Sequence, residues 1–218
     1  MLNMDFSKMV VINTSKMDWL PSPAAGVWRK PLAREEVESG HATSIVKYEA
    51  GASFNAHNHP LGEEIFVLEG IFSDETGDYP AGSYIRNPKG FIHAPFSKEG
   101  CTLLVKLHQF QTDDLTQVRI NTKESEWLAE GNGGIKVLPL HQHNSEQVLL
   151  VDWSANEDYA RHKHNKGEEV YIISGELKDE FGSYPAGSWI RLPHDSEHSP
   201  YVEEDTLFWV KVGHLPEA

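Results

Sequence analysis

The sequence predicts an all-β protein with two tandem domains of the same architecture. Three observations support this prediction: an internal repeat, a series of short segments rich in β-branched and aromatic residues, and a polar segment between the two halves. The chain has 218 residues, which is long enough for two domains of about 100 residues that each bury a core. No long amphipathic helical pattern accompanies the short segments.

The repeat is the strongest of these observations because its two copies align without a gap. The first copy reads HNHPLGEEIFVLEGIFSDETGDYPAGSYIRNPKGFIHAPF, and the second reads HKHNKGEEVYIISGELKDEFGSYPAGSWIRLPHDSEHSPY. The residues that recur 105 positions later include His57, His59, Glu63, Gly70, Gly82, Pro88 and His93, which match His162, His164, Glu168, Gly175, Gly187, Pro193 and His198. Upstream, Trp19 and Leu20 match Trp127 and Leu128 at an offset of 108. A duplicated unit of about 100 residues explains this pattern.

The short segments of each unit are predicted strands. The first unit contains SIVKYEA, EEIFVLEGIF, GSYIRNP and TLLVKLHQF, and the second contains VLLVDW, EEVYIISGEL, GSWIRLP and TLFWVKV. The turn sequence Tyr-Pro-Ala-Gly follows the second of these segments in both units and suits a connection between antiparallel strands. Many short strands in a unit of this size favour a sandwich or a small closed barrel.

The domain boundary is predicted in the polar segment TDDLTQVRINTKES, residues 112–125. We place it near Asp113, so that residues 1–112 form the first domain and residues 113–218 the second. The segment could also carry a strand of its own.

Charge and composition restrict the partners. The net charge of −14 repels nucleic-acid phosphates and anionic membrane surfaces, so a small-molecule ligand or substrate is expected rather than nucleic acid or a membrane. The first residues lack the pattern of a signal peptide, and no segment reaches the roughly 20 apolar residues of a membrane span. Cys101 is the only cysteine, which suits a reducing cytoplasm and excludes a multi-cysteine metal site. A metal ion would therefore be held by nitrogen and oxygen donors, and the sequence offers 12 histidines.

The repeated histidines have the spacing of a metal site. His57 and His59 are two residues apart, so on an extended strand their side chains project from one face, about 7 Å apart along the backbone. Glu63 or its neighbour Glu64 follows a Pro-Leu-Gly turn, and His93 arrives from another strand. A single His-x-His pair is more often a pair of surface histidines. Its recurrence with a glutamate and a third histidine favours a metal site in each domain, because core packing requires no such set.

The same residues resemble the cupin motifs. Gly51, His57, His59, Glu63 and Gly70 are similar in order and spacing to the first motif, and Gly82, Pro88, Gly90 and His93 to the second. The segment HPLGEEIFVLEGIFSDETGDYPAGSYIRNPKGFIH resembles the ChrR-like cupins, a group that includes the metal-sensing half of an anti-sigma factor and, more distantly, acetylacetone dioxygenase. The resemblance implies two jelly-roll barrels, each with one divalent transition metal ion (Zn, Fe, Mn or Ni) in its mouth.

Carried over by position, the resemblance assigns four metal ligands to each domain. They are His57, His59, Glu63 and His93 in the first, and His162, His164, Glu168 and His198 in the second. The family spacing of six residues before the motif glycine selects Glu63 and Glu168 over Glu64 and Glu169. Two positions depart from the motifs, because Asn156 replaces the glycine at Gly51 and Asp195 the glycine at Gly90. Asn and Asp tolerate left-handed backbone angles best among the other residues, so both turns are expected to survive.

Two functions remain open at this point. The first is a metal-dependent dioxygenase that acts on a small chelating substrate such as a dicarbonyl compound. The second is a zinc-binding sensor or regulator without catalytic activity, like the anti-sigma factor. Isomerisation or decarboxylation ranks last because no repeated acid besides Glu64 and Glu169 offers itself as a proton donor. Barrels of this type often associate through their outer sheets, which leaves a homodimer possible.

Two further expectations concern the surroundings of the sites. The repeated Arg86 and Arg191 either orient an anionic substrate at the barrel mouth or occupy outward-facing strand positions, and the sequence does not decide between these alternatives. The first pocket is expected to be the drier one, because Phe54, Phe66, Phe91 and Ile92 become Tyr159, Tyr171, Ser196 and Glu197 in the second unit.

Overall fold

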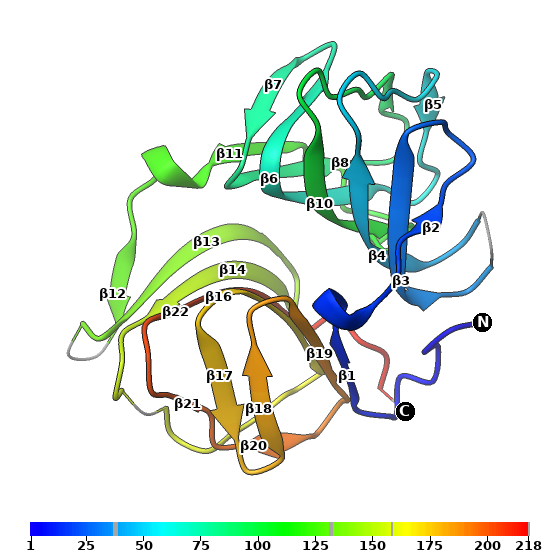
Figure 1. Ribbon diagram of the computed structural model, residues 1–218. Helices are drawn as coiled ribbons and strands as arrows, with labels where there is room; N and C mark the ends of the chain where they lie inside the picture. The colour runs from blue at the N-terminus through cyan, green and yellow to red at the C-terminus, as the bar shows by residue number, and fades with distance from the viewer. Residues whose placement is uncertain (37–38, 131–132, 158, 218) are drawn as a thin grey trace. The chain divides into compact units, whose positions relative to one another are not determined.

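The structure, a computed structural model, describes residues 1–36, 39–130, 133–157 and 159–217. The chain forms two compact units, of which the first contains Met1–Met4 and Met17–Ser125 and the second Asp5–Lys16 and Glu126–Ala218. In each unit the strands curve around a common interior (Figure 1). The described residues contain no α-helix, only two short 3-10 turns, η1 (Thr14–Lys16) and η2 (Thr122–Glu124). The predicted all-β fold with two repeated barrels is confirmed.

The first unit is built on one antiparallel sheet with the strand order β11-β8-β6-β10-β4-β3-β2. Its strands are β2 (Leu20–Pro21), β3 (Val27–Arg34), β4 (Ala42–Tyr48), β6 (Glu63–Asp74), β8 (Ser83–Asn87), β10 (Cys101–Leu107) and β11 (Val118–Asn121). β7 (Gly77–Pro80) pairs with the far end of β6, and β5 (His57–Asn58) pairs with β9 (Ile92–His93).

The second unit repeats this arrangement in the order β1-β19-β16-β22-β14-β13-β12. Its strands are β1 (Val10–Asn13), β12 (Leu128–Glu130), β13 (Ile135–His143), β14 (Glu146–Trp153), β16 (Glu168–Ser174), β19 (Ser188–Leu192) and β22 (Thr206–Val212). A smaller sheet holds β17 (Glu176–Asp179), β18 (Gly182–Pro185) and β21 (Tyr201–Val202), and β15 (His162–Lys163) pairs with β20 (Glu197–His198).

The edge strands show that the two repeats exchange their first segments. β1 belongs to the first repeat of the sequence but pairs with β19 of the second unit, whereas β11, its match 108 residues later, pairs with β8 of the first unit. Thr14 Oγ1 donates to the Gly187 carbonyl at 2.8 Å, and Thr122 Oγ1 donates to the Gly82 carbonyl at 2.6 Å. The structural division therefore lies at residues 125 and 126, whereas the sequence placed the boundary near 113, because the polar segment carries a strand that pairs within the first unit.

Alternation along the strands decides which residues face each interior. In the first unit Val27, Ile65, Phe72, Ile85, Leu103 and Val105 form one buried cluster. In the second unit Val151, Val170, Leu177, Ile190, Phe208 and Val210 form the corresponding cluster. Because successive side chains point to opposite faces of a strand, Glu63 shares the inner face of β6 with Ile65, and Glu64 lies on the outer face.

Two glycine positions of the motifs are replaced in the second unit without loss of the turn. Gly51 and Gly90 have φ angles of 80° and 90°, and Asn156 and Asp195, which replace them, have φ angles of 62° and 64°. All four lie in the left-handed region, which Asn and Asp enter more readily than other residues with a side chain. The expectation that both turns survive is confirmed.

Candidate metal centres

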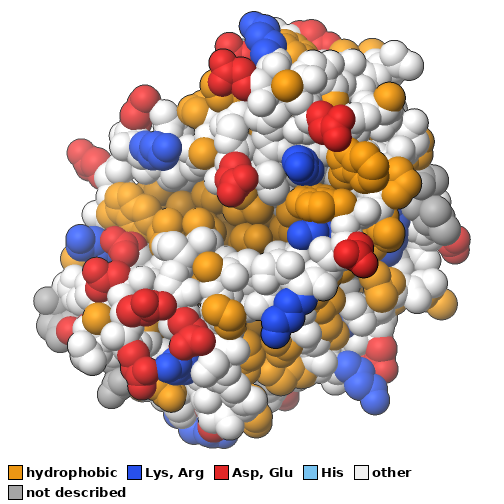
Figure 2. Space-filling model, viewed as in Figure 1, with side chains coloured by type: hydrophobic (Ala, Val, Ile, Leu, Met, Phe, Trp, Pro, Cys, Tyr) orange, Lys and Arg blue, Asp and Glu red, His pale blue; other side chains and the backbone are white. Residues whose placement is uncertain are grey.

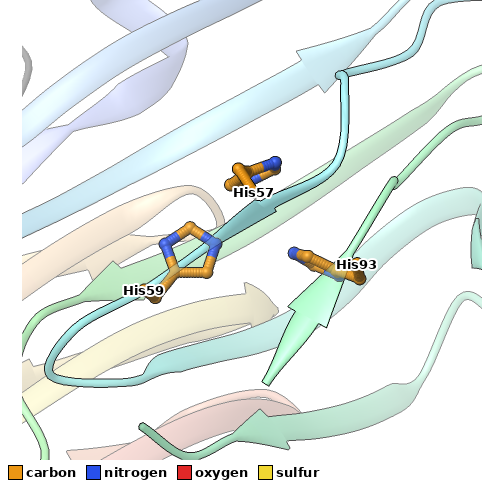
Figure 3. Close-up of side chains that lie close together, drawn as sticks. All are labelled: His57, His59 and His93. Carbon is orange, nitrogen blue, oxygen red and sulfur yellow. The ribbon is translucent and has the colours of Figure 1, made fainter. Parts of the chain in front are cut away.

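Three histidines of the first unit meet at one point. β5 pairs with β9 so that His57 stands directly opposite His93, and His59 follows on the same segment as His57. One ring nitrogen from each residue can be chosen so that all three lie within 4.8 Å of one another. The three rings surround a common space (Figure 3), with centroids 4.8 Å apart for His57 and His59, 5.0 Å for His57 and His93, and 5.6 Å for His59 and His93.

Glu63 lies against this cluster, and Glu64 does not. The Glu63 carboxylate is 3.4 Å from His59 Nε2 and 3.3 Å from His93 Nε2, and it accepts a hydrogen bond of 2.9 Å from Asn87 Nδ2. Glu64, on the other face of β6, pairs with Arg86 at 3.2 Å. The structure thus places the glutamate that the motif spacing selects beside the histidines.

The second unit repeats the cluster with His162, His164 and His198. Their ring centroids are 4.7 to 4.8 Å apart, and β15 pairs with β20 so that His162 faces His198. One ring nitrogen from each lies within 4.8 Å of the others. Glu168 is 3.4 Å from His164 Nδ1 and 4.0 Å from His198 Nε2, whereas Glu169 lies 3.5 Å from His214. All eight residues assigned from the sequence therefore fall into two groups of four.

Oxygen atoms behind the clusters hold several of the rings. Nδ1 of His57 lies 2.8 Å from the Asn55 carbonyl, and Nδ1 of His162 lies 3.1 Å from the Ala160 carbonyl. When Nδ1–H donates to such an oxygen, the Nε2 lone pair is available on the opposite side of the ring. This is the usual arrangement of metal-binding histidines.

The third histidine of each cluster has an aspartate behind it. Nδ1 of His198 lies 3.1 Å from Asp179, and Nδ1 of His93 lies 3.5 Å from Asp74. The sequence analysis missed Asp74 and Asp179. The signal was present, because these two acids also match at the offset of 105.

Burial sets the charge of the donors. It lowers the pKa of His59, against the opposing charge of Glu63, and lowers the pKa of His164 to about 3. Burial also raises the pKa of Glu168 to about 7. At Glu63, burial acts in the same direction, but His59, His93 and Asn87 outweigh it and the pKa is lowered. Near neutral pH, His59 and His164 are therefore uncharged, and neutral imidazole is the form that binds metal ions.

The Nε2 atoms of His59, His93 and His164 are buried and form no hydrogen bond with any residue that the structure describes. Buried polar atoms without a partner are rare and costly, and a bound cation is one way to satisfy them. The donor set of three imidazoles and one carboxylate fits zinc, iron, manganese and nickel. The residues present therefore fit a divalent ion in each unit.

Arg86 and Arg191 do not belong to the clusters. Both are fully buried, and Arg86 pairs with Glu64 and Asp114 on the outer face of the sheet. The Arg86 guanidinium also stacks over the Phe110 ring, and that of Arg191 stacks over Phe6 and donates to the Asp5 carbonyl at 2.9 Å. Of the two alternatives, the outward-facing position is the one observed.

Each cluster lines a cavity inside its own barrel. The second cavity has a volume of about 390 Å³ and the first about 180 Å³. Of the four substitutions that suggested a drier first pocket, only Phe54 and its counterpart Tyr159 line the cavities. Phe66 and Tyr171 follow Glu64 and Glu169 at two-residue spacing and share their outer face. Charged residues line both cavities, Arg29 and Arg34 in the first and Glu130 and Lys163 in the second, so a drier first pocket stays a prediction.

The surface agrees with the charge of the sequence. Figure 2 shows acidic and basic side chains interspersed on the face in view, without a continuous basic patch. No helix within the described residues is long and apolar enough to cross a membrane.

Comparisons with known proteins agree with the fold and the duplication. A family model described as the ChrR Cupin-like domain matches residues 7–111 and again residues 115–216. A proposed dioxygenase from Nostoc punctiforme has a similar structure, with a TM-score of 0.80, 16% identity, and coverage of 97% of this chain and 85% of that one. The protein Ylba from E. coli aligns with a TM-score of 0.74, 13% identity and coverage of 98% and 94%.

A third similar structure is oxalate decarboxylase from Bacillus subtilis, in work on its Mn(II) centres. It aligns with a TM-score of 0.66, 15% identity and coverage of 97% of this chain and 78% of that one. No curated protein sequence matches the chain. At these identities the structural similarities show a shared fold.

Proposed function

This chain belongs to the ChrR cupin-like domain family, and from that premise we propose that it is a metal-dependent enzyme of the dioxygenase type that acts on a small chelating substrate. Each barrel holds one divalent ion. The proposed ligands are His57, His59, Glu63 and His93 in the first unit and His162, His164, Glu168 and His198 in the second. The net charge of −14 and the solitary cysteine support a small-molecule ligand and a cytoplasmic location as parts of this proposal.

The observation that carries the proposal is that each cluster lines a cavity, so a molecule in the cavity could reach an ion bound by the cluster. Structural metal sites are usually closed, whereas catalytic sites keep positions open for an exogenous ligand. In the second unit, Val151, Leu177, Phe208 and Val210 surround the cluster with apolar wall. When bound, a redox-active ion would supply Lewis acidity and electron transfer to a chelating substrate and dioxygen.

The protein's own residues would position the ion and keep the site dry. The histidines bind it through the nitrogens that face the cavity, and Asp74 and Asp179 fix the rings of His93 and His198 from behind. Asn87 donates to Glu63 and orients its carboxylate. The apolar walls restrict water, which strengthens electrostatic interactions with a bound substrate.

The comparisons support the choice of chemistry only as analogies. One protein of similar fold is a proposed dioxygenase, and another is an oxalate decarboxylase with Mn(II) centres. A second candidate function rests on the family description, which names ChrR: a zinc-loaded sensor that binds a ligand without turnover.

Metal analysis of the purified full-length protein tests the proposal. Two equivalents of metal per chain are expected, one after His57→Ala or His162→Ala, and none after both substitutions. His143→Ala is the matched control, because it removes a histidine outside both clusters. Iron with oxygen-dependent turnover of a β-dicarbonyl compound supports the enzyme, and tightly held zinc without turnover supports the sensor. Unchanged metal content in the double variant would refute both.

A further inference from the structure

The cavity of the second unit has an aliphatic wall. Val137 of β13, Leu149 and Val151 of β14 and Val212 of β22 line it. Val137, Leu149 and Val212 are only half-buried, although they pack against the core cluster of the unit. Aliphatic side chains that stay partly exposed inside a cavity form a surface that an apolar group can cover, and covering it is favourable.

The buried part of this wall has few polar side chains besides the three histidines and Glu168. The other polar side chains that line the cavity, apart from Trp153, are exposed, and they are Glu130, Ser145, Gln147, Tyr159, Lys163 and Asn165. Trp153 is buried, but its indole nitrogen donates to the Glu157 carbonyl at 2.8 Å. A charged or strongly polar group in the buried part of the cavity would lose its hydration and gain no side-chain partner outside the cluster, at least among the residues described.

The equivalent strand of the first unit has hydroxyl groups at two of these positions. At the offset of 105, Ser44 of β4 matches Leu149 of β14, and the strand register agrees with this match. Tyr48 matches Trp153 in the same way, and all four residues line the cavity of their own unit. Ser44 is only 5% exposed, and its hydroxyl has no hydrogen-bond partner within the described parts of the chain. The aliphatic surface beside the cluster is therefore more extensive along β14 than along β4.

The two cavities also differ in volume. The second measures about 390 Å³ and the first about 180 Å³. Sites for small molecules usually measure about 300 to 1,000 Å³. The second cavity lies within this range and has room for a chain in addition to the group that would reach the ion, whereas the first lies below it.

We propose that the second barrel binds a chelating molecule with an alkyl chain. Its oxygen donors reach the ion held by the second cluster, and its chain lies along Val137, Leu149 and Val151. The first barrel admits only short chelators. This inference deepens the proposed function and rests on it, because the second cluster must hold the ion. The wall residues bind the chain, and no bond-breaking step is assigned to them.

Isothermal titration of the full-length protein loaded with Zn²⁺ tests the inference. The probes are acetohydroxamate and octanohydroxamate, which chelate zinc through the same group and differ only in the length of the alkyl chain. In His57→Ala, which keeps the second site, octanohydroxamate is expected to bind about 100-fold more tightly than acetohydroxamate. Each buried methylene contributes about fourfold to affinity, and part of the chain stays exposed. In His162→Ala, which keeps the first site, octanohydroxamate should bind no more tightly than acetohydroxamate.

A substitution in the wall tests where the chain lies. Leu149→Ser gives the second wall the residue that the first has at this position. It should weaken octanohydroxamate binding about 5- to 10-fold and leave acetohydroxamate binding within about twofold. Leu207→Ser is the matched control, because Leu207 is also half-buried but lies on β22 outside the cavity lining. Equal effects of the two substitutions would contradict the placement of the chain.

The outcomes separate this inference from the function on which it rests. If the second site takes up no metal, the proposed function fails there and the inference falls with it. If metal is bound but His57→Ala binds the two hydroxamates equally, the inference alone is overturned. Thermal unfolding checks the folding of each variant. The wild-type protein gives a result without any variant, because about one tightly bound octanohydroxamate per chain is expected, and either two or none would overturn the inference.

Discussion

Asp179 lies behind His198, with its carboxylate 3.1 Å from the histidine Nδ1, whereas Nε2 of the same ring lies 4.0 Å from the Glu168 carboxylate. Tyr184 donates a second hydrogen bond of 2.8 Å to the same carboxylate. Asp74 stands in the equivalent place behind His93. The carboxylate holds the ring and selects the tautomer whose Nε2 is available at the cavity.

Asp179→Asn is therefore expected to weaken metal binding at the second site by about 10- to 100-fold, the usual effect of removing the partner of a metal-binding histidine. Competition between the protein and a chromophoric chelator for Zn²⁺ measures this affinity. Asp152→Asn, on β14 outside the cluster, is the matched control and should leave it unchanged. Equal affinities for wild type and Asp179→Asn would contradict the role assigned to the aspartate.

Glu63 and Glu64 are adjacent but should respond differently to the same substitution. Glu63→Gln is expected to lower metal content at the first site, because its carboxylate lies with the histidines. Glu64→Gln should leave the metal content unchanged and lower the free energy of unfolding by about 3 to 5 kcal/mol, because it breaks a buried ion pair with Arg86. Metal analysis and urea unfolding of both variants separate the two effects. Loss of metal from Glu64→Gln with full retention in Glu63→Gln would reverse the assignment.

The exchanged edge segments depend on two equivalent threonines. Thr14 donates its hydroxyl to Gly187 and Thr122 to Gly82. Thr14→Ala and Thr122→Ala are each expected to lower the free energy of unfolding by about 1 kcal/mol, the typical value for one such hydrogen bond. Urea unfolding tests this with the exposed Thr112→Ala as the control. No loss of stability in either variant would mean that the exchanged segments contribute little.

The sequence predicted the two clusters because duplication preserved the order of their donors. The gapless offset of 105 aligns His57 with His162 and His93 with His198. A repeated metal site explains why three histidines and a glutamate recur at unchanged spacing, whereas core packing does not require them. Strand alternation predicts that Glu63 and Glu64 lie on opposite faces. It does not predict which of them faces inward, because a turn precedes them.

Other features depend on contacts that no local pattern encodes. The pairing of β1 with the second unit is a tertiary choice between two similar sheet edges, so the sequence could not reveal the exchange. The recurrence of Arg86 as Arg191 left their role open between substrate binding and an outward-facing strand position, and the structure shows buried positions on the outer face.

Cys101, the first residue of β10, should react slowly with thiol reagents in the native protein. It is 5% exposed, and burial raises the pKa of its thiol to about 11, with only partial compensation by Ser97. At pH 8 about one thiol in a thousand is then ionised, compared with roughly a quarter for an unperturbed cysteine, and only the thiolate is nucleophilic. Titration with a chromogenic disulfide should detect about one thiol in guanidinium chloride and almost none within minutes in buffer. Equal labelling rates in the two conditions would show that the end of β10 opens readily, because access and ionisation must both be restored for the thiol to react.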